Sequence, residues 1–182
     1  MPIWVNASAF TRNKSTDTVH WQSVEGLGYS GSAMLLQPFD AKLQKDISQN
    51  PALEYEFTTE QADSALIRLY LLPTHPADSR NALRIAVSVD NSAPQLFNIE
   101  TVGRSNAWKE NVLRNQTIVK LPWHFTSGGK HTLRIIAVDA DIIIDQLMID
   151  FKTKRLDQVK NASCCYAGSS DISSVGRHFR LM

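Results

Sequence analysis

The 182-residue chain has little of the material that several classes of protein require. Its two cysteines, Cys164 and Cys165, are adjacent, so they build neither a disulfide framework nor a zinc site. With 19 basic and 18 acidic residues the formal net charge is +1, which does not favour nucleic acid or an anionic membrane as a partner. No apolar run approaches the roughly 20 residues of a membrane span. The N-terminus, MPIWVNAS, has no signal-peptide pattern and leads almost directly into a strand, as in a domain cut from a larger protein.

Motifs that would indicate catalysis or a cofactor are also lacking. The stretch GLGYSG at residues 26–31 has the glycine spacing of a dinucleotide-binding turn, but that turn requires a following helix. Pro38 would break such a helix at once, so we interpret the glycines as a tight turn between strands. The same stretch misses the serine-hydrolase pattern because residue 32 is serine rather than glycine.

Metal-binding patterns fail in a similar way. Residues 139–150 place acidic side chains at several calcium-loop positions, but Ile143 and Ile144 stand where an oxygen ligand and a glycine are needed. The five histidines are scattered, and none has a second histidine at metal-ligand spacing. The sequence therefore predicts no catalytic residue, no metal site and no cofactor.

The chain contains many segments with the sequence pattern of a β-strand. Residues 53–57 alternate apolar and acidic side chains, and residues 83–90 alternate so regularly that they predict a half-buried antiparallel strand. Residues 65–73 are more apolar and end at Pro73, which indicates a strand nearer the centre of a sheet. Further strands are expected at 95–100, 116–121, 131–139 and 142–151. We expect the last two to form a closing hairpin around the polar turn at 139–141.

Turn residues separate these runs at intervals of about 8 to 20 residues, a spacing typical of a sandwich or barrel. Residues 41–50 fit a short helix or a long loop, and residues 102–116 fit a helical turn around Trp108. After Phe151 the pattern dissolves into small polar residues. The prediction is one all-β domain, an antiparallel β-sandwich over residues 1–151, followed by a poorly packed tail at 152–182.

Aromatic side chains are the remaining candidates for function. An aromatic ring can stack on the apolar C–H face of a sugar while polar neighbours bind its hydroxyls. Trp21, Trp108 and Trp123 fall in segments predicted as loops or strand ends, where binding sites concentrate, and Tyr29 falls in the glycine turn. The alternative is that each ring closes one end of the sandwich core.

The order of the motifs resembles a known family. The series begins with SAFTRN, a tryptophan and GLGYSGSAMLLQP, in that order. It continues with LEYEF, LYLLPTHP and LRIAVSVDNSAPQ, and then with Trp108 and GKHTLRIIAVDADIIIDQLMIDF. Over about residues 3–151 this order resembles the C-terminal β-sandwich domain of glycoside hydrolase family 115, the xylan α-1,2-glucuronidases. The closing motif is similar to that of family 35 carbohydrate-binding modules.

The resemblance implies a jelly-roll, galactose-binding-like sandwich that is not an enzyme by itself, because the catalytic residues of that family lie in upstream domains. It implies an accessory role in assembling the enzyme, with the upstream catalytic domains or a homodimer partner, and an extracellular location if the chain is part of such an enzyme. Asn6-Ala7-Ser8 stands where related modules carry two calcium-binding carboxylates, so no calcium is predicted. The alternative function is an autonomous carbohydrate-binding module for xylan or uronic-acid-bearing glycans, with Trp21, Tyr29, Trp108 and Trp123 as its sugar contacts.

Overall fold

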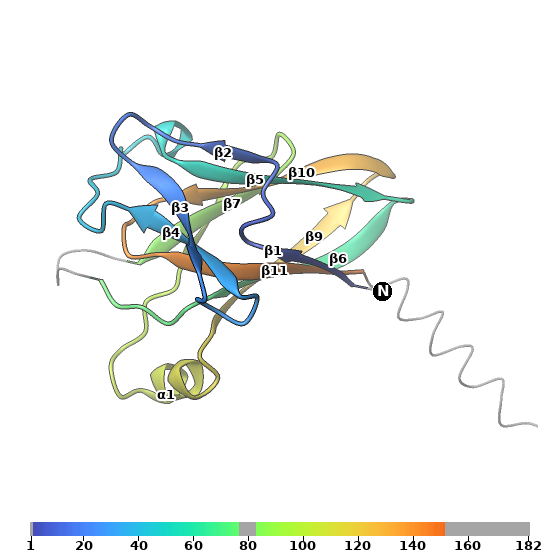
Figure 1. The fold of residues 1–182 in the computed structure, drawn as a ribbon. Helices are drawn as coiled ribbons and strands as arrows, with labels where there is room; N and C mark the ends of the chain where they lie inside the picture. The colour runs from blue at the N-terminus through green and yellow to red at the C-terminus, as the bar shows by residue number, and fades with distance from the viewer. Residues whose placement is uncertain (1, 77–82, 152–182) are drawn as a thin grey trace, which may run out of the picture.

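A computed structural model describes residues 2–76 and 83–151. They form two facing antiparallel sheets, seen edge-on in Figure 1. The six-stranded sheet has the order β3-β4-β11-β6-β9, with β1 also paired to β11. Its strands are β1 Ile3–Asn6, β3 His20–Glu25, β4 Ser32–Gln37, β6 Asp63–Leu71, β9 Thr117–Phe125 and β11 Ile143–Phe151.

The five-stranded sheet has the order β2-β5-β10-β7-β8. Its strands are β2 Arg12–Lys14, β5 Ala52–Thr59, β7 Arg84–Val89, β8 Gln95–Asn98 and β10 Gly129–Ala137. A 3-10 turn, η1 Ile47–Gln49, precedes β5, and one α-helix, α1 Asn106–Leu113, precedes β9. The predicted antiparallel sandwich and the helical turn around Trp108 are therefore confirmed.

The core lies between the sheets, where the inward-facing residues of each strand meet. Val87 and Ile135 of the five-stranded sheet and Leu69 and Leu147 of the six-stranded sheet are all at most 1% exposed. The strand predicted nearest the centre, β6, is indeed flanked on both sides, by β11 and β9. Alternation in the sequence thus identified the core-facing residues, because successive side chains of a strand point to opposite faces.

Residues 83–90 were predicted to form a strand with one buried and one exposed face. The exposure of the second face is wrong for β7. Ala86 and Ser88 point away from the core, yet they are 0% and 3% exposed. The chain between β4 and β5 covers part of this face, since Ile47 packs against a small cluster that contains Ala86. The segment left open as helix or loop is thus a loop with one 3-10 turn that shields the sheet.

The predicted closing hairpin is also wrong. β10 pairs with β5 and β7, whereas β11 pairs with strands of the other sheet, so residues 139–141 connect the two layers. Asp139 stays with the first layer, because its carboxylate accepts two hydrogen bonds from the Arg84 guanidinium, at 2.7 and 2.9 Å. These bonds raise the pKa of Arg84. A short polar link between two strands does not reveal whether the strands pair.

The glycine stretch at 26–31 is the turn of the β3–β4 hairpin, as predicted, and no helix follows it. The Gly26 amide donates to the Gly31 carbonyl at 2.9 Å, and φ is positive at Gly26, Gly28 and Gly31. Glycine adopts this conformation at little cost. The predicted tail at 152–182 lies outside the described residues. Neither helix in the described ranges is long and apolar enough to cross a membrane.

Candidate functional site: the surface around α1 and a polar pocket

The four candidate aromatic residues separate into a core pair and a surface pair. Trp21 lies on β3 and is 2% exposed within the core, so its ring presents no face to a sugar. Trp123 shares the inward side of β9 with Val119 and Leu121 and packs, half-buried, against the same core. Trp21 is therefore a core residue, as in the alternative interpretation, and Trp123 packs in part against the core.

Tyr29 and Trp108 both belong to the surface at α1. Tyr29 is 66% exposed, and its hydroxyl donates to the carbonyl of Arg114, the residue that caps the helix, at 3.2 Å. Trp108 lies within α1, and its indole Nε1 donates to His75 Nε2 at 2.9 Å. The helix thus connects the glycine turn with the loop after β6.

A buried carboxylate holds the glycine turn in place. Asp145 on β11 is 0% exposed, and its two oxygens accept the amides of Tyr29 and Ser30 at 3.0 Å each. The Ser30 hydroxyl also donates to the Asp145 carbonyl at 3.1 Å. Amide hydrogen bonds of this kind offset the cost of burying a charge. Gly28 fits against the same group, since a Cβ atom there would lie 2.3 Å from Asp145 Oδ1. This arrangement fixes the position of Tyr29.

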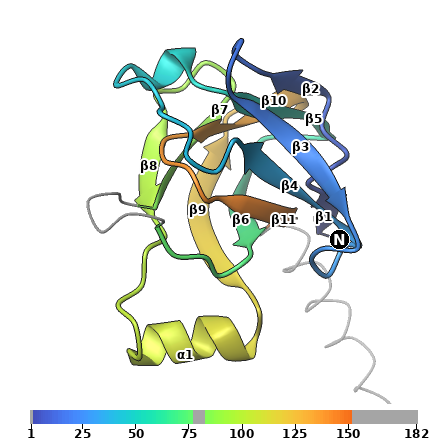
Figure 2. The same ribbon diagram turned by 60° about the vertical axis from the view of Figure 1, so that its left-hand side comes forward.

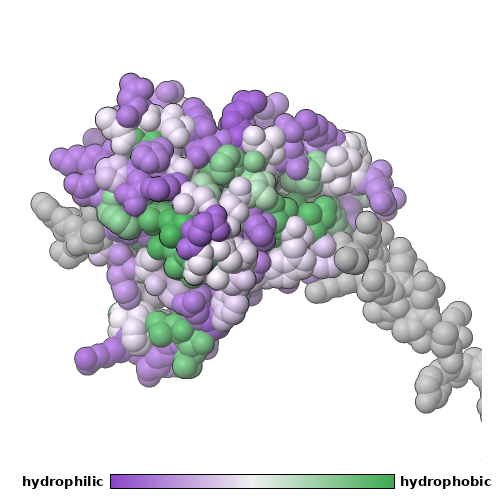
Figure 3. Space-filling model, in the orientation of Figure 1, coloured by the Kyte–Doolittle hydropathy of each residue, from purple (hydrophilic) through white to green (hydrophobic). Residues whose placement is uncertain are grey.

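The helix exposes apolar side chains beside this turn. Leu113 is 86% exposed and Val112 is 45% exposed. Figure 2 shows α1 projecting below the sandwich, and Figure 3 shows apolar side chains gathered on it. We call Tyr29, Trp108, Val112 and Leu113 the α1 surface. Clustered exposed apolar residues of this kind are typical of a contact site.

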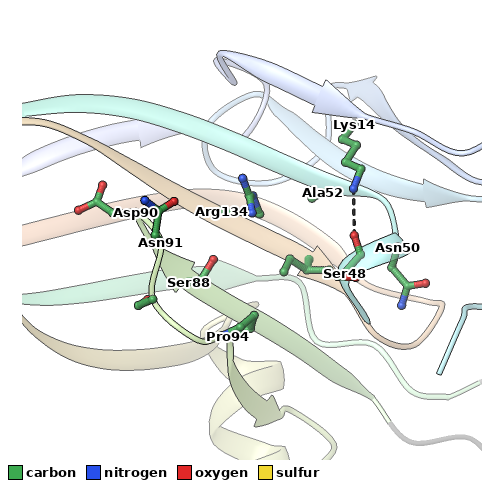
Figure 4. A pocket seen from close by; sticks show the side chains of 11 residues that line it. Lys14, Ser48, Asn50, Ala52, Ser88, Asp90, Asn91, Pro94 and Arg134 are labelled. Atoms are coloured by element: carbon green, nitrogen blue, oxygen red, sulfur yellow. Dashed lines mark hydrogen bonds between the residues drawn. The ribbon is translucent and has the colours of Figure 1, made fainter. Parts of the chain in front are cut away.

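A compact pocket lies elsewhere, on the outer face of the five-stranded sheet (Figure 4), with a volume of about 280 Å³. Its floor includes small side chains of two strands, Ala52 on β5 and Ser88 on β7. In Figure 4, Lys14 and Ser48 stand on one side. Asp90 and Asn91 stand on the other, with Arg134 between the two sides. The remaining lining residues are Asn50, Ser92, Pro94 and Ile136.

The charged groups of this pocket are held by neighbouring partners. The Lys14 ammonium donates to the Ser48 carbonyl at 2.9 Å, and Arg134 Nε donates to Glu54 at 2.9 Å. One oxygen of Asp90 accepts the Thr132 amide at 2.9 Å, and the other lies 2.9 Å from Nδ1 of the buried His131. Each group keeps further donors or acceptors for a ligand.

A second, wider groove of about 1010 Å³ lies on the other side of η1. Phe39 and Leu96 line it and are both more than half exposed, and the Arg84–Asp139 pair forms part of its wall. This groove brings fewer fixed polar groups together than the compact pocket does.

Two surface features have no signal within one stretch of sequence: the pocket and one aromatic pair. The pocket draws on four separate stretches of chain, at residues 14, 48–52, 88–94 and 134–136, so no local motif marks it. Trp4 on β1 is 53% exposed and stacks on Tyr70 of β6, with ring centroids 5.5 Å apart. The outward position of Trp4 was readable from the alternation of β1, but its neighbour comes from a strand that is distant in sequence.

No group of three histidine, cysteine or acidic side chains in the described ranges is placed to hold a metal ion. In the Asn6-Ala7-Ser8 stretch, Ser8 Oγ lies 2.7 Å from Ser32 Oγ. The absence of calcium stays a prediction.

The chain matches both a protein-family model and a solved enzyme of the same family. The model of the glycosyl hydrolase family 115 C-terminal domain matches residues 3–164. A solved family GH115 4-O-methyl-α-glucuronidase, BtGH115A, whose stated specificity is for decorated arabinogalactans, is 34% identical with a TM-score of 0.63. That match covers 81% of this chain but 17% of the enzyme, so the chain spans a small part of its relative. No curated protein matches the chain significantly.

Isolated carbohydrate-binding modules share the fold. A family 35 module from Clostridium thermocellum superposes with a TM-score of 0.52 at 13% identity, over 81% of this chain and 98% of the module. The C-terminal CBM6 of the laminarinase LamC from Zobellia galactanivorans does so with a TM-score of 0.51 at 9% identity, over 82% and 99%. At such identities the likeness concerns the fold alone. The family match over residues 3–164, together with 34% identity to a solved member, establishes that the chain belongs to glycosyl hydrolase family 115 as its C-terminal domain.

Proposed function

We propose that this domain is a non-catalytic accessory domain of a family 115-like xylan α-1,2-glucuronidase, and that its α1 surface docks on the catalytic part of the same enzyme. The observation that supports this proposal is the exposed apolar surface of α1, present in a domain that matches only a small part of its solved relative. A chain that corresponds to 17% of its relative has a large neighbour to contact.

The α1 surface is suited to docking because it is held rigidly before contact. The Ser105 hydroxyl caps the helix by accepting the Trp108 amide at 3.1 Å, and the Tyr29 hydroxyl binds the other end of the helix. Asp145 in turn fixes the backbone of Tyr29. A surface that is already ordered loses little conformational entropy on binding. Burying a leucine as exposed as Leu113 contributes about 1.5–3 kcal/mol.

The test uses this chain and the polypeptide encoded upstream of it, expressed separately and mixed. We expect a complex by sedimentation velocity, weakened at least tenfold by Leu113→Ser combined with Val112→Ser. Leu96→Ser is the matched control, because Leu96 is also exposed but lies on β8. An upstream region without a hydrolase domain, or a complex unaffected by the double variant, would contradict the proposal. Self-association lost in the same variant would reassign the surface to a homodimer.

A second candidate function is carbohydrate binding, for which the specific observation is that the exposed Tyr29 binds the end of the helix that carries the partly exposed Trp108. The Tyr29 ring offers a face to a sugar, and the fold is that of carbohydrate-binding modules. Calorimetry with glucuronoxylan tests this function, and Tyr29→Ala and Trp108→Ala should each reduce affinity. The buried Trp21 offers no such contact, so it is not retained in the candidate site.

A further inference from the structure

We propose that the compact pocket on the outer face of the five-stranded sheet binds a single sugar unit, at the end or at a branch of a glycan. This inference rests on the carbohydrate-binding candidate above but places the ligand at different residues. The pocket lies on the sheet face, whereas the α1 surface belongs to a helix that projects from the sandwich (Figures 2 and 4).

The hollow is built into the sheet. Ala52 on β5 and Ser88 on β7 are small residues that lie on either side of β10, opposite Ile136 and Arg134 respectively. Longer side chains at these two positions would fill the space. Asn50 fixes the rim beside them. It is 1% exposed, its amide nitrogen donates to the Ala137 carbonyl at 3.0 Å, and its oxygen accepts the Gln44 amide at 2.8 Å. The pocket is therefore formed before any ligand arrives.

The size of the pocket selects the ligand. At about 280 Å³ it lies just below the usual range of small-molecule sites, roughly 300–1,000 Å³. One pyranose or furanose ring fits such a volume, but consecutive units of a chain do not. The pocket is thus suited to a chain end or a side branch rather than to the middle of a polysaccharide.

The lining supplies both kinds of contact that a sugar ring requires. The exposed Pro94 offers apolar surface for the C–H face of the ring. Lys14 and Arg134 have donors beyond those used by Ser48 and Glu54, which suits the oxygens of vicinal hydroxyls. The exposed amide of Asn91 adds one donor group and one acceptor at the opposite rim. Because Ser48 and Glu54 hold the two cations in place, binding costs little further side-chain ordering.

The experiment is a two-dimensional amide NMR titration of the 182-residue chain with methyl glycosides of xylose, arabinose, galactose and glucuronic acid. We expect saturable shifts for at least one of them, with a dissociation constant of about 1 mM or weaker, centred on Ser88, Asn91 and the 48–50 turn. The neutral and acidic glycosides distinguish hydroxyl recognition from recognition of a carboxylate by Lys14 and Arg134.

Two variants locate the ligand. Asn91→Ala should weaken binding about fivefold to tenfold by removing one amide contact, and Ser88→Leu should abolish binding by filling the floor. Asn106→Ala is the matched control, because Asn106 is also an exposed asparagine but lies on α1. If Ser88→Leu fails to fold, Asn91→Ala still decides the question, since its side chain is exposed and its loss leaves the core intact.

The outcomes separate the proposals. Shifts centred on Tyr29 and Trp108, with unchanged affinity in Asn91→Ala, would overturn the pocket and support carbohydrate binding at α1. No saturable binding to any glycoside at about 20 mM would overturn the pocket. The carbohydrate-binding candidate at α1 is decided separately, by calorimetry with glucuronoxylan. Neither result affects the docking test, which measures association between polypeptides.

Discussion

Replacing Gly28 with alanine should destabilise the domain far more than the same change at Gly31, three residues away. Both glycines have a left-handed backbone, with φ of +81° and +85°. They differ in what surrounds them. A Cβ atom at Gly31 meets open space, whereas a Cβ atom at Gly28 would lie 2.3 Å from Asp145 Oδ1 and 2.6 Å from Asp145 Cγ. The pair therefore separates backbone strain from the fit of the turn against the buried carboxylate.

The expected magnitudes follow from this difference. Alanine in the left-handed region costs about 1–2 kcal/mol at either position. At Gly28 the added methyl group also forces Asp145 away from the amides of Tyr29 and Ser30, and hydrogen bonds to a charged group contribute about 1.5–3 kcal/mol. Because the turn yields in part, we expect a total loss of about 3–5 kcal/mol in the free energy of unfolding for Gly28→Ala. Gly31→Ala should lose about 1–2 kcal/mol.

Urea denaturation followed by tryptophan fluorescence measures both variants. In an Asp145→Ala background the clash disappears, so Gly28→Ala should there cost no more than Gly31→Ala, a coupling of about 2 kcal/mol. The matching thermal midpoints should differ by about 4–12 °C between the two single variants. If Gly28→Ala and Gly31→Ala lie within about 0.5 kcal/mol of each other, the role assigned to Asp145 is refuted.

Other predictions concern the core and the sheet surface. Burial raises the pKa of Tyr55, and its hydroxyl donates to the Ala7 carbonyl at 2.8 Å. Because Tyr55→Phe removes this hydrogen bond, it should lower the free energy of unfolding by about 1–2 kcal/mol in urea denaturation. An unchanged midpoint would contradict this bond. Asn50→Ala should cost about 2–4 kcal/mol and increase hydrogen exchange at residues 44–50, because its amide holds that segment to β10; unchanged protection would contradict this. Trp21→Ala should cost about 3–5 kcal/mol without altering affinity for any glycan that the folded variant still binds, and a selective loss of binding would restore Trp21 as a contact.

The strands were predictable because their evidence is local. The alternation from Leu83 to Val89 and the apolar run before Pro73 each mark a strand within a few residues, and the structure has both. The outward burial of Ala86 was not predictable. It depends on the segment around Ile47, which packs against the cluster that contains Ala86, and nothing in the alternation of β7 encodes that contact.

The candidate site shows the same division. Tyr29 was expected at a surface turn and lies on one, whereas Trp21 was expected near a loop and lies in the core. Both are large aromatic residues close to turn signals, so composition and neighbours do not distinguish them. Trp21 is buried because it lies on the side of β3 that faces the opposite sheet, and only the packing of the two sheets shows which side that is.

The sequence by itself determined the strand class, the core-facing alternation, the glycine turn and the resemblance to the family 115 C-terminal domain. These features depend on side-chain periodicity and backbone freedom, which act over a few residues. Only the tertiary structure decided that β10 and β11 belong to different sheets, that Asp145 holds the glycine turn, and that four stretches enclose one pocket. Such contacts join residues up to 116 positions apart, and their partners are set by how the two sheets pack together.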